Sequence, residues 1–194
     1  MADAPRGEDA VLVAVQSALA GRPAVLPAAR ALSHFGEHSI GWLAVAALGA
    51  LLVPARRREY LTAGAGAFAA HASAVVIKRV VRRERPHHPA IAVNVGTPSR
   101  LSFPSAHATS TTAAAVLLAG PTGLPLPALL VPPMALSRMV LGVHYPSDVL
   151  AGVVIGAVVA NVVGGVADRV ERSDAMSACA KWGPARSGGD RVNR

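Results

Sequence analysis

Three segments of this sequence combine cationic, hydroxyl and imidazole side chains in patterns that could hold an anion and attack it. In the first, Lys78 and Arg85 are seven residues apart, so they would share one face of a helix that Pro86 ends. A guanidinium binds phosphate through two parallel hydrogen bonds and an ammonium acts as a point charge, so the two suit a phosphoryl group. Taken alone, the segment is more typical of a basic flank at a membrane surface.

The second segment places a histidine at the start of a run of Ala, Thr and Ser residues. Pro104 suits the first position of a helix, which would leave the backbone N–H groups of Ser105 and Ala106 free to bind an anion. The Ser105 hydroxyl adds a further donor, and His107, one turn in, could protonate a leaving oxygen. An isolated histidine here would more simply hydrogen-bond a neighbouring helix, so this interpretation depends on the other two segments.

The third segment, from Ser137 to Asp148, joins the ends of two apolar blocks. Arg138 supplies a third cation, and His144 lies just before the second block. Asp148 falls in the first turn of the following helix, where the helix dipole favours a carboxylate, and could reach the His144 ring. A carboxylate on one ring nitrogen orients the imidazole and leaves the other nitrogen free to attack. Asp148 could also serve as a plain helix cap.

The elements that must position these segments are apolar. Hydrophobic residues make up 52% of the 194 residues and charged residues only 15%, and the apolar residues occur in blocks rather than with the periodicity of a half-buried element. Several blocks approach the ~20 residues that cross a bilayer core. The sequence therefore predicts an all-α fold, a polytopic membrane helical bundle with about five spanning helices. The five blocks are residues 39–54, 60–77, 104–118, 125–143 and 146–167.

Three regions are expected along the chain. Residues 1–37 contain two helical runs, 10–20 and 24–34, which are too short to span and predict an N-terminal interfacial helical segment. Residues 38–168 form the membrane-embedded core, which holds all three reactive segments. Residues 169–194 form a polar tail without apolar periodicity, which is expected to be disordered.

Charge along the chain predicts which membrane face each end occupies. Arg56, Arg57 and Arg58 follow the first block and the tail is also basic, so the positive-inside rule places both in the cytoplasm. Five crossings then bring the three reactive segments to the extracytoplasmic face of the plasma membrane. The loop from Arg82 to Phe103 is itself basic, and it agrees with this topology if its cations hold phosphate.

The residues singled out above resemble the signatures of the type 2 phosphatidic acid phosphatase superfamily. All three signatures occur in the order and with the spacing of that family, and the match covers roughly residues 38–168. The signatures are Lys78 to Arg85-Pro86, Pro104-Ser105-x-His107, and Ser137-Arg138 to His144 to Asp148. One departure is Ala106, where the family usually has glycine. Alanine is tolerated there if the residue is helical and does not need a positive φ.

The resemblance implies an integral membrane lipid phosphatase that works without a metal ion or another cofactor. His144 would attack phosphorus and form a phosphohistidine, with Asp148 orienting its ring and His107 protonating the departing alcohol. The phosphate-binding residues would be Lys78, Arg85, Ser105, Ala106 and Arg138. No role is assigned to four further histidines, His34, His38, His87 and His88.

The substrate is less closely defined than the reaction. The chain is similar to small actinobacterial members of the superfamily that act on decaprenylphosphoryl-5-phosphoribose, a precursor of cell-wall arabinan. Polyprenyl diphosphates, phosphatidate-type lipids and a role as a non-catalytic lipid-binding subunit stay open as alternatives, whereas the related vanadium haloperoxidases are soluble. Despite a formal net charge of +8, an aromatic content of 4% and the lack of a recognition motif argue against nucleic acid. The sequence allows a homo-oligomer without predicting one.

Overall fold

The computed structural model describes residues 4–181, and every named element within them is a helix. In chain order the elements are α1 (Gly7–Leu19), α2 (Val25–Gly36), the 3-10 turn η1 (Glu37–Ser39), α3 (Ile40–Leu52), η2 (Pro54–Arg56), α4 (Arg57–Val81), α5 (Ala106–Thr122), α6 (Leu126–Val140) and α7 (Pro146–Lys181). One isolated antiparallel bridge, between Glu84 and Leu101, ties together the long loop that follows α4. The all-α prediction is confirmed.

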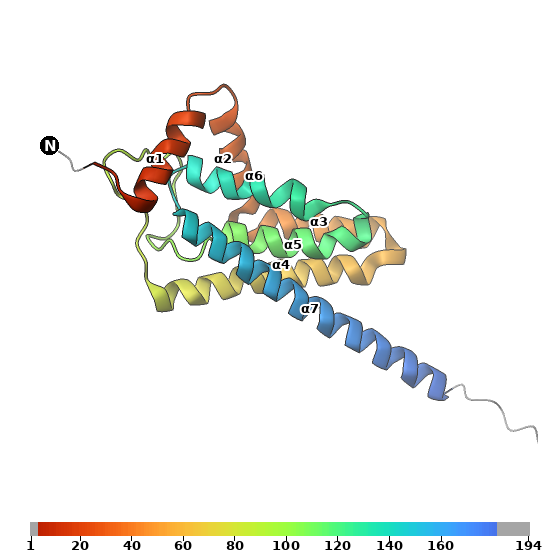
Figure 1. Ribbon diagram of the computed structural model, residues 1–194. Helices are drawn as coiled ribbons and strands as arrows, with labels where there is room; N and C mark the ends of the chain where they lie inside the picture. The colour runs from red at the N-terminus through yellow and green to blue at the C-terminus, as the bar shows by residue number, and fades with distance from the viewer. Residues whose placement is uncertain (1–3, 182–194) are drawn as a thin grey trace, which may run out of the picture.

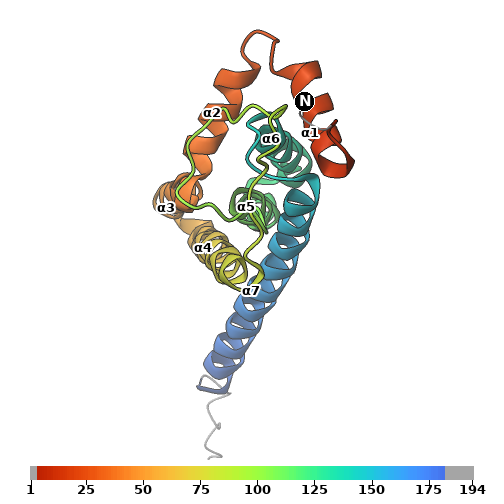
Figure 2. The same ribbon diagram turned by 90° about the vertical axis from the view of Figure 1, so that its left-hand side faces the viewer.

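Helix α5 forms the centre of the bundle, with α3, α4, α6 and α7 around it (Figures 1 and 2). Most of its Ala, Ser and Thr side chains are buried, and such small side chains let helix backbones approach closely. On α7, a Cβ added at Gly152 would lie 2.8 Å from the carbonyl oxygen of Ser105, and one at Gly156 would lie 2.3 Å from that of Thr109. The two glycines therefore allow α7 to pack directly on α5.

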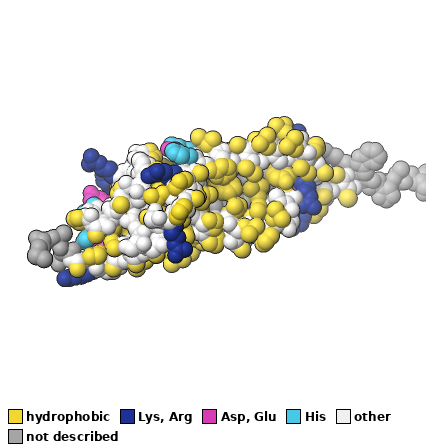
Figure 3. Space-filling model, turned by 90° about the horizontal axis from the view of Figure 1, so that it is seen from above, with side chains coloured by type: hydrophobic (Ala, Val, Ile, Leu, Met, Phe, Trp, Pro, Cys, Tyr) yellow, Lys and Arg dark blue, Asp and Glu magenta, His cyan; other side chains and the backbone are white. Residues whose placement is uncertain are grey.

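The outer surface of the bundle is apolar along most of its length. Figure 3 shows hydrophobic side chains over the middle of the molecule and Lys and Arg side chains toward its two ends. Among the described residues, three stretches are long and apolar enough to cross a membrane, Val25–Leu52, Pro54–Val81 and Pro146–Cys179. Helix α6 is apolar but shorter, and α5 has 17 residues and is enclosed by its neighbours. The five predicted blocks thus correspond to α3 through α7, of which only some have the length of a full span.

Helices α1 and α2 form a hairpin across one end of the bundle (Figures 1 and 2). Helix α2 leads into α3 through a bend at His38 and Ser39, whose φ angles are 49° and 62°, so residues 25–52 are not one straight helix. The loop of residues 82–105 crosses the same end (Figure 2). The three segments singled out in the sequence therefore meet at this end of the bundle.

The end of α4 differs from the sequence prediction. The helix stops at Val81 instead of running to Pro86, because Arg82 adopts the left-handed conformation (φ 55°) and caps it. Lys78 is consequently in the last turn of α4 while Arg85 lies beyond it in the loop, so the prediction that they share a helical face was wrong. What brings them together is the folding of the loop, as described below.

The C-terminal boundary also differs. Helix α7 continues to Lys181, so residues 169–181 of the tail that was expected to be disordered are helical, and the rest of that tail lies outside the described residues. Asp174 on this extension accepts a hydrogen bond of 3.0 Å from Arg58 at the start of α4. The helical extension is therefore joined to the bundle by an ion pair.

Candidate active site

A cavity of about 460 Å³ opens at the end of the bundle where the three segments meet. Six of the eight residues predicted to act at the site line it, namely Lys78, Arg85, Ala106, His107, Arg138 and His144. The other two, Ser105 and Asp148, are fully buried and do not reach its surface. The cavity thus joins residues from α4, α5, α6 and the two loops that follow α4 and α6.

The geometry around His144 distinguishes its two ring nitrogens. Nε2 lies 3.2 Å from Nη1 of Arg85, and because a guanidinium has only donors, Nε2 must be the unprotonated acceptor. The ring proton is therefore on Nδ1, which lies 3.7 Å from Oδ2 of Asp148. Burial, followed by the positive charge of Arg85 and other cations, holds the pKa of His144 well below its ordinary value. At neutral pH the site presents a neutral imidazole whose unprotonated Nε2 faces the cavity and Arg85.

The Asp148 carboxylate makes the contact of a helix cap and also faces the His144 ring. Oδ2 accepts a hydrogen bond of 2.8 Å from the backbone N–H of Tyr145, the residue before α7, which is the contact of a helix cap. The same oxygen faces His144, at a distance longer than a hydrogen bond. Oδ1 accepts a hydrogen bond of 3.0 Å from Nη1 of Arg83. Asp148 is therefore fixed by Tyr145 and Arg83, and it faces His144 without a hydrogen bond.

Arg83 and Glu8 support this carboxylate, and neither was singled out in the sequence. Arg83 also donates 2.6 Å to the hydroxyl of Ser147, lies over the ring of Tyr145 with Cζ 4.2 Å from its centroid, and forms a short ion pair with Glu8. Glu8 in turn accepts 2.9 Å from the backbone N–H of Ser147. Against the effect of burial, the hydrogen bond between them raises the pKa of Arg83 and lowers that of Glu8. The N-terminal segment is thus tied to the start of α7.

Four cations line the cavity, Arg79 and the three predicted to bind phosphate, and the hydrogen bonding of those three is unequal. Lys78 donates 3.0 Å and 2.9 Å hydrogen bonds to the carbonyl oxygens of Leu101 and Ser102, which holds it against the loop. Arg85 donates 2.8 Å to the carbonyl oxygen of Ser99 and 2.6 Å to that of Val143. These contacts, together with the bridge at Glu84, are what bring the loop cation beside the helical one. Burial lowers the pKa of Arg85 to about 10, so it is charged at neutral pH.

Arg138 is the least satisfied of the three cations. Only 2% of its surface is exposed, and its Nε and Nη1 atoms are buried without a hydrogen-bond partner among the described residues. An unpaired buried charge is costly, and unsatisfied donors of this kind call for a partner. A phosphoryl group in the cavity would supply the oxygens that Arg138 needs.

The start of α5 departs from the prediction. Ser105, not Pro104, stands at the helix boundary, with an extended backbone (ψ 106°) and a hydroxyl that accepts a 3.4 Å hydrogen bond from the Ala108 N–H. The Ser105 N–H is not free, because it donates 2.9 Å to the carbonyl oxygen of Asp148. Ala106 is the first helical residue and lies outside the positive-φ region, so alanine can replace glycine there without strain.

His107 lies in the first turn of α5 and lines the cavity, and its ring is hydrogen-bonded to α2. Its Nε2 donates a 2.9 Å hydrogen bond to the carbonyl oxygen of Ser33, since a carbonyl can only accept. The contact with a neighbouring helix that an isolated histidine would make is therefore present. Because only Nε2 is used, Nδ1 stays available to carry a proton to or from a ligand.

Further residues line the cavity. His34, Glu37, His38 and His71 are part of its wall, whereas the exposed His87 and its neighbour His88 are not. His71 could have been found in the sequence, because it precedes Lys78 by seven residues on the same helix and so lies on the same face. No spacing rule could have linked Glu8 to Arg83, since 75 residues separate them. Among the described residues, no three His, Cys, Asp or Glu side chains are grouped to hold a metal ion.

The fold is a helical bundle, and at one of its ends a buried histidine lies in a cavity lined with cations. Residues 59–170 match the PAP2 superfamily, the type 2 phosphatidic acid phosphatases. The chain belongs to this superfamily and is a membrane phosphatase, so the resemblance found in the sequence is confirmed.

Two similar proteins both have the name decaprenylphosphoryl-5-phosphoribose phosphatase. The one from Mycolicibacterium smegmatis is 82% identical over 152 residues, which cover 78% of this chain and 84% of that protein. The one from Mycobacterium tuberculosis strain H37Rv is 69% identical over 170 residues, which cover 88% of this chain and 96% of that protein.

Two solved structures share the fold at low sequence identity. A PAP2-type phosphatidylglycerolphosphate phosphatase from Bacillus subtilis superposes with a TM-score of 0.65 at 20% identity, covering 83% of this chain and 86% of that one. LpxE from Aquifex aeolicus superposes with a TM-score of 0.59 at 18% identity, covering 79% and 92%. The prediction of a membrane helical bundle of this family is therefore confirmed.

Proposed function

We propose that this protein hydrolyses the 5-phosphate monoester of decaprenylphosphoryl-5-phosphoribose, releasing inorganic phosphate and the ribosyl lipid. The observation that carries the proposal is the 82% identity, over 84% of its length, to a phosphatase of that name. The cavity supports it, because a phosphate monoester has the charge that Lys78, Arg85 and Arg138 would neutralise.

The proposed reaction has two steps. In the first, the Nε2 lone pair of His144 forms a bond to phosphorus while the bond from phosphorus to the sugar oxygen breaks. His107, doubly protonated when the negative charge of the phosphate is bound beside it, gives that oxygen the proton on Nδ1 and keeps its Nε2 proton on the Ser33 carbonyl oxygen. In the second step, His107 takes a proton from water, whose oxygen attacks the phosphohistidine and releases phosphate. The cations stabilise the charge on the equatorial oxygens in both steps.

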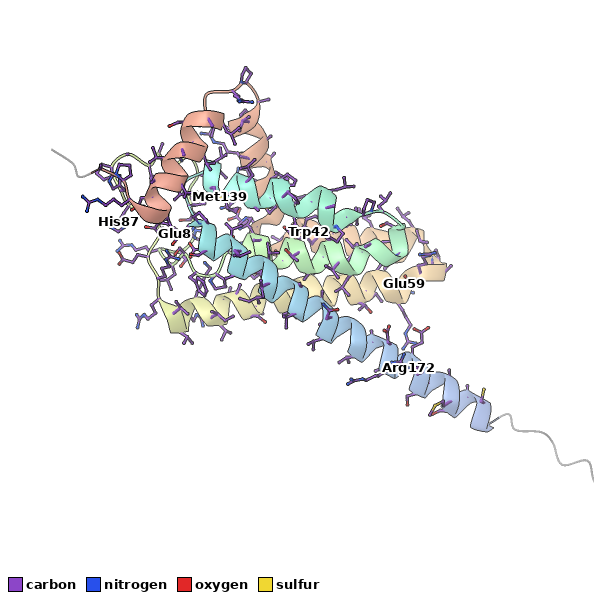
Figure 4. The ribbon with its side chains drawn as sticks, in the orientation of Figure 1. Glu8, Trp42, Glu59, His87, Met139 and Arg172 are labelled. Carbon is purple, nitrogen blue, oxygen red and sulfur yellow. The ribbon has the colours of Figure 1, made fainter. Side chains whose placement is uncertain are left out.

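The active site is assigned to the extracytoplasmic face of the plasma membrane. Figure 4 shows Glu8 and His87 at one end of the molecule and Glu59 and Arg172 at the other. The second end therefore carries both the basic turn before α4 and the basic C-terminal part of α7. Positive charge flanking spans favours the cytoplasm, which leaves the cavity on the outer side.

Phosphate release by the detergent-purified protein in EDTA tests the proposed function. The panel comprises polyprenylphosphoryl-5-phosphoribose, polyprenyl monophosphate, polyprenyl diphosphate and phosphatidate. We expect the phosphoribosyl lipid to have the highest kcat/KM. Release from none of the four lipids would leave the non-catalytic lipid-binding role, and a preference for the diphosphate or phosphatidate would replace the proposed substrate.

The ion pair between Arg83 and Glu8 leads to a separate prediction about positioning. Replacing Arg83 with Gln should lower kcat roughly tenfold and change KM little, because the Asp148 carboxylate loses one charge-assisted hydrogen bond while the cavity cations stay in place. Steady-state kinetics on the phosphoribosyl lipid measures both constants. Arg83→Lys should restore part of kcat, which a general loss of folding would not allow.

A matched ion pair provides the control for this prediction. Arg58 and Asp174 are 3.0 Å apart at the opposite end of the bundle, so Arg58→Gln should change neither constant. Glu8→Gln should also lower kcat, but by less than Arg83→Gln. If Arg83→Gln instead raises KM at constant kcat, Arg83 contacts substrate and does not act through Asp148.

A further inference from the structure

The cavity contains a second set of polar side chains, which the proposed mechanism does not use. Glu37, His38 and His71 line it together with the phosphate-facing cations. A cavity of about 460 Å³ is within the range that holds a whole small ligand, so it has room for more than a phosphoryl group. These three side chains are therefore available to the part of the substrate next to the phosphate.

Glu37 and His38 reach the cavity through a strained bend. His38 and Ser39 have positive φ angles of 49° and 62°, a region that residues other than glycine seldom adopt. Gly36, two residues before His38, lets this bend lie against the site, since a Cβ there would be 2.8 Å from Cδ2 of His107. Backbone strain of this kind clusters at ligand-binding segments, where the surrounding structure maintains it.

His71 faces the bend from helix α4. Its ring centroid lies 5.9 Å from that of His38. Its Nδ1 atom is buried and has no hydrogen-bond partner among the described residues. A buried ring nitrogen without a partner is destabilising, and a hydroxyl group of a ligand in the cavity would satisfy it.

Glu37 places a carboxylate beside cations that suit phosphate. Its Oε2 lies 3.9 Å from Nδ1 of His34, and 46% of the Glu37 side chain is exposed. A carboxylate repels a phosphate group, so it does not contribute to binding the phosphoryl oxygens. It accepts hydrogen bonds from hydroxyl groups, and its two oxygens can receive two adjacent ones.

We infer that Glu37, His38 and His71 bind the hydroxyl groups of the sugar that carries the phosphate to be removed. The inference rests on the proposed function, which places a phosphorylated ribose in this cavity. Polyprenyl phosphates and phosphatidate have no free hydroxyl groups next to their phosphate. The subsite therefore favours a phosphosugar lipid over the other lipid phosphates that the cations alone would accept.

Replacing Glu37 with alanine tests the subsite through selectivity. The two probes are a short-chain polyprenylphosphoryl-5-phosphoribose and polyprenyl monophosphate, each assayed for kcat/KM. We expect the ratio of the first value to the second to fall roughly 10- to 100-fold, the effect of losing hydrogen bonds to a charged group. His71→Phe, which keeps a ring but removes its nitrogens, should lower the same ratio.

The chain offers a closely matched control. Glu59 has a 49% exposed side chain and lies 3.9 Å from Arg56 three residues before it, as Glu37 lies 3.9 Å from His34, but at the opposite end of the bundle. Glu59→Ala should leave the ratio unchanged. A third test needs no variant, because an analogue lacking both ribose hydroxyl groups should lose most of its advantage over polyprenyl monophosphate with the wild-type protein.

The outcomes separate this inference from the proposed function. If the wild-type protein hydrolyses the phosphoribosyl lipid, but neither variant nor the analogue lowers the ratio, the subsite is wrong and the proposed function stands. An equal loss on both probes also overturns it, because it would assign Glu37 to the phosphate site or to folding. If the wild-type protein releases no phosphate from the phosphoribosyl lipid, the function and the subsite fail together.

Discussion

Replacing His144 with alanine is expected to abolish phosphate release, lowering kcat roughly 10⁴-fold or more, as removal of a nucleophile generally does. The reason is the unprotonated Nε2 atom, which lies 3.2 Å from Arg85 in a cavity lined with cations. Among the described residues, no other imidazole in that cavity has a carboxylate near one ring nitrogen and a guanidinium near the other. Phosphate release from the phosphoribosyl lipid measures the effect.

Trapping the intermediate makes this expectation specific to covalent catalysis. Rapid quenching of the wild-type protein in alkali with ³²P-labelled substrate should retain label that acid removes, the behaviour of a phosphoramidate, and His144→Ala should retain none. His87→Ala is the control, because His87 is exposed at the same end of the bundle and does not line the cavity. Label retained by His144→Ala would move the nucleophile to another residue.

The meeting of the three segments could be predicted from the sequence, because it follows from topology alone. An odd number of crossings between the arginine turn and the reactive loops places those loops at one end, and Lys78, His107 and His144 do share one cavity there. The proximity of His144 and Asp148 could also be predicted, since Asp148 falls in the first turn of a helix that begins just after His144. The roles given to these residues stay predictions, which the experiments above test.

The local backbone could not be read in the same way. The stretch around Arg82 contains no glycine to mark a helix end, so nothing in the sequence shows that α4 stops there in a left-handed residue. Likewise, both Pro104 and Ser105 suit a helix start. Ser105 stands at the boundary of α5, and its N–H donates a hydrogen bond to the carbonyl oxygen of Asp148, which lies on α7. A tertiary contact therefore accompanies the boundary of α5.

The long-range ion pair between Glu8 and Arg83 could not be predicted from the sequence either. Glu8 belongs to a segment that the sequence describes only as an interfacial helix, yet it contacts Arg83 and the N–H of Ser147, which is 139 residues away. A polar residue on an amphipathic helix normally faces water, so the composition of residues 1–37 does not predict that Glu8 contacts Arg83. The support of Asp148 thus includes a part of the chain that lies outside the 59–170 family match.

Replacing Arg138 with methionine is expected to change activity and stability in opposite directions. Arg138 is 2% exposed, and within the part of the chain that the structure describes two nitrogens of its guanidinium have no partner, so the folded protein carries a buried charge that is not compensated. An apolar side chain of similar length should raise the thermal unfolding temperature. The same change should lower kcat/KM roughly 10²- to 10³-fold, as removing one donor to a transition-state oxyanion does.

Orthovanadate binding separates this explanation from a simple loss of packing. It resembles the phosphoryl group in charge and shape, so it should raise the unfolding temperature of the wild-type protein and have little effect on Arg138→Met. Arg138→Lys keeps the charge without the bidentate fork and should lie between the two in kcat/KM. Arg58→Met, at the end of the bundle opposite the cavity, should keep full activity. Full activity of Arg138→Met would show that Arg138 does not bind phosphate. Loss of both activity and stability would show that Arg138 holds the bundle together.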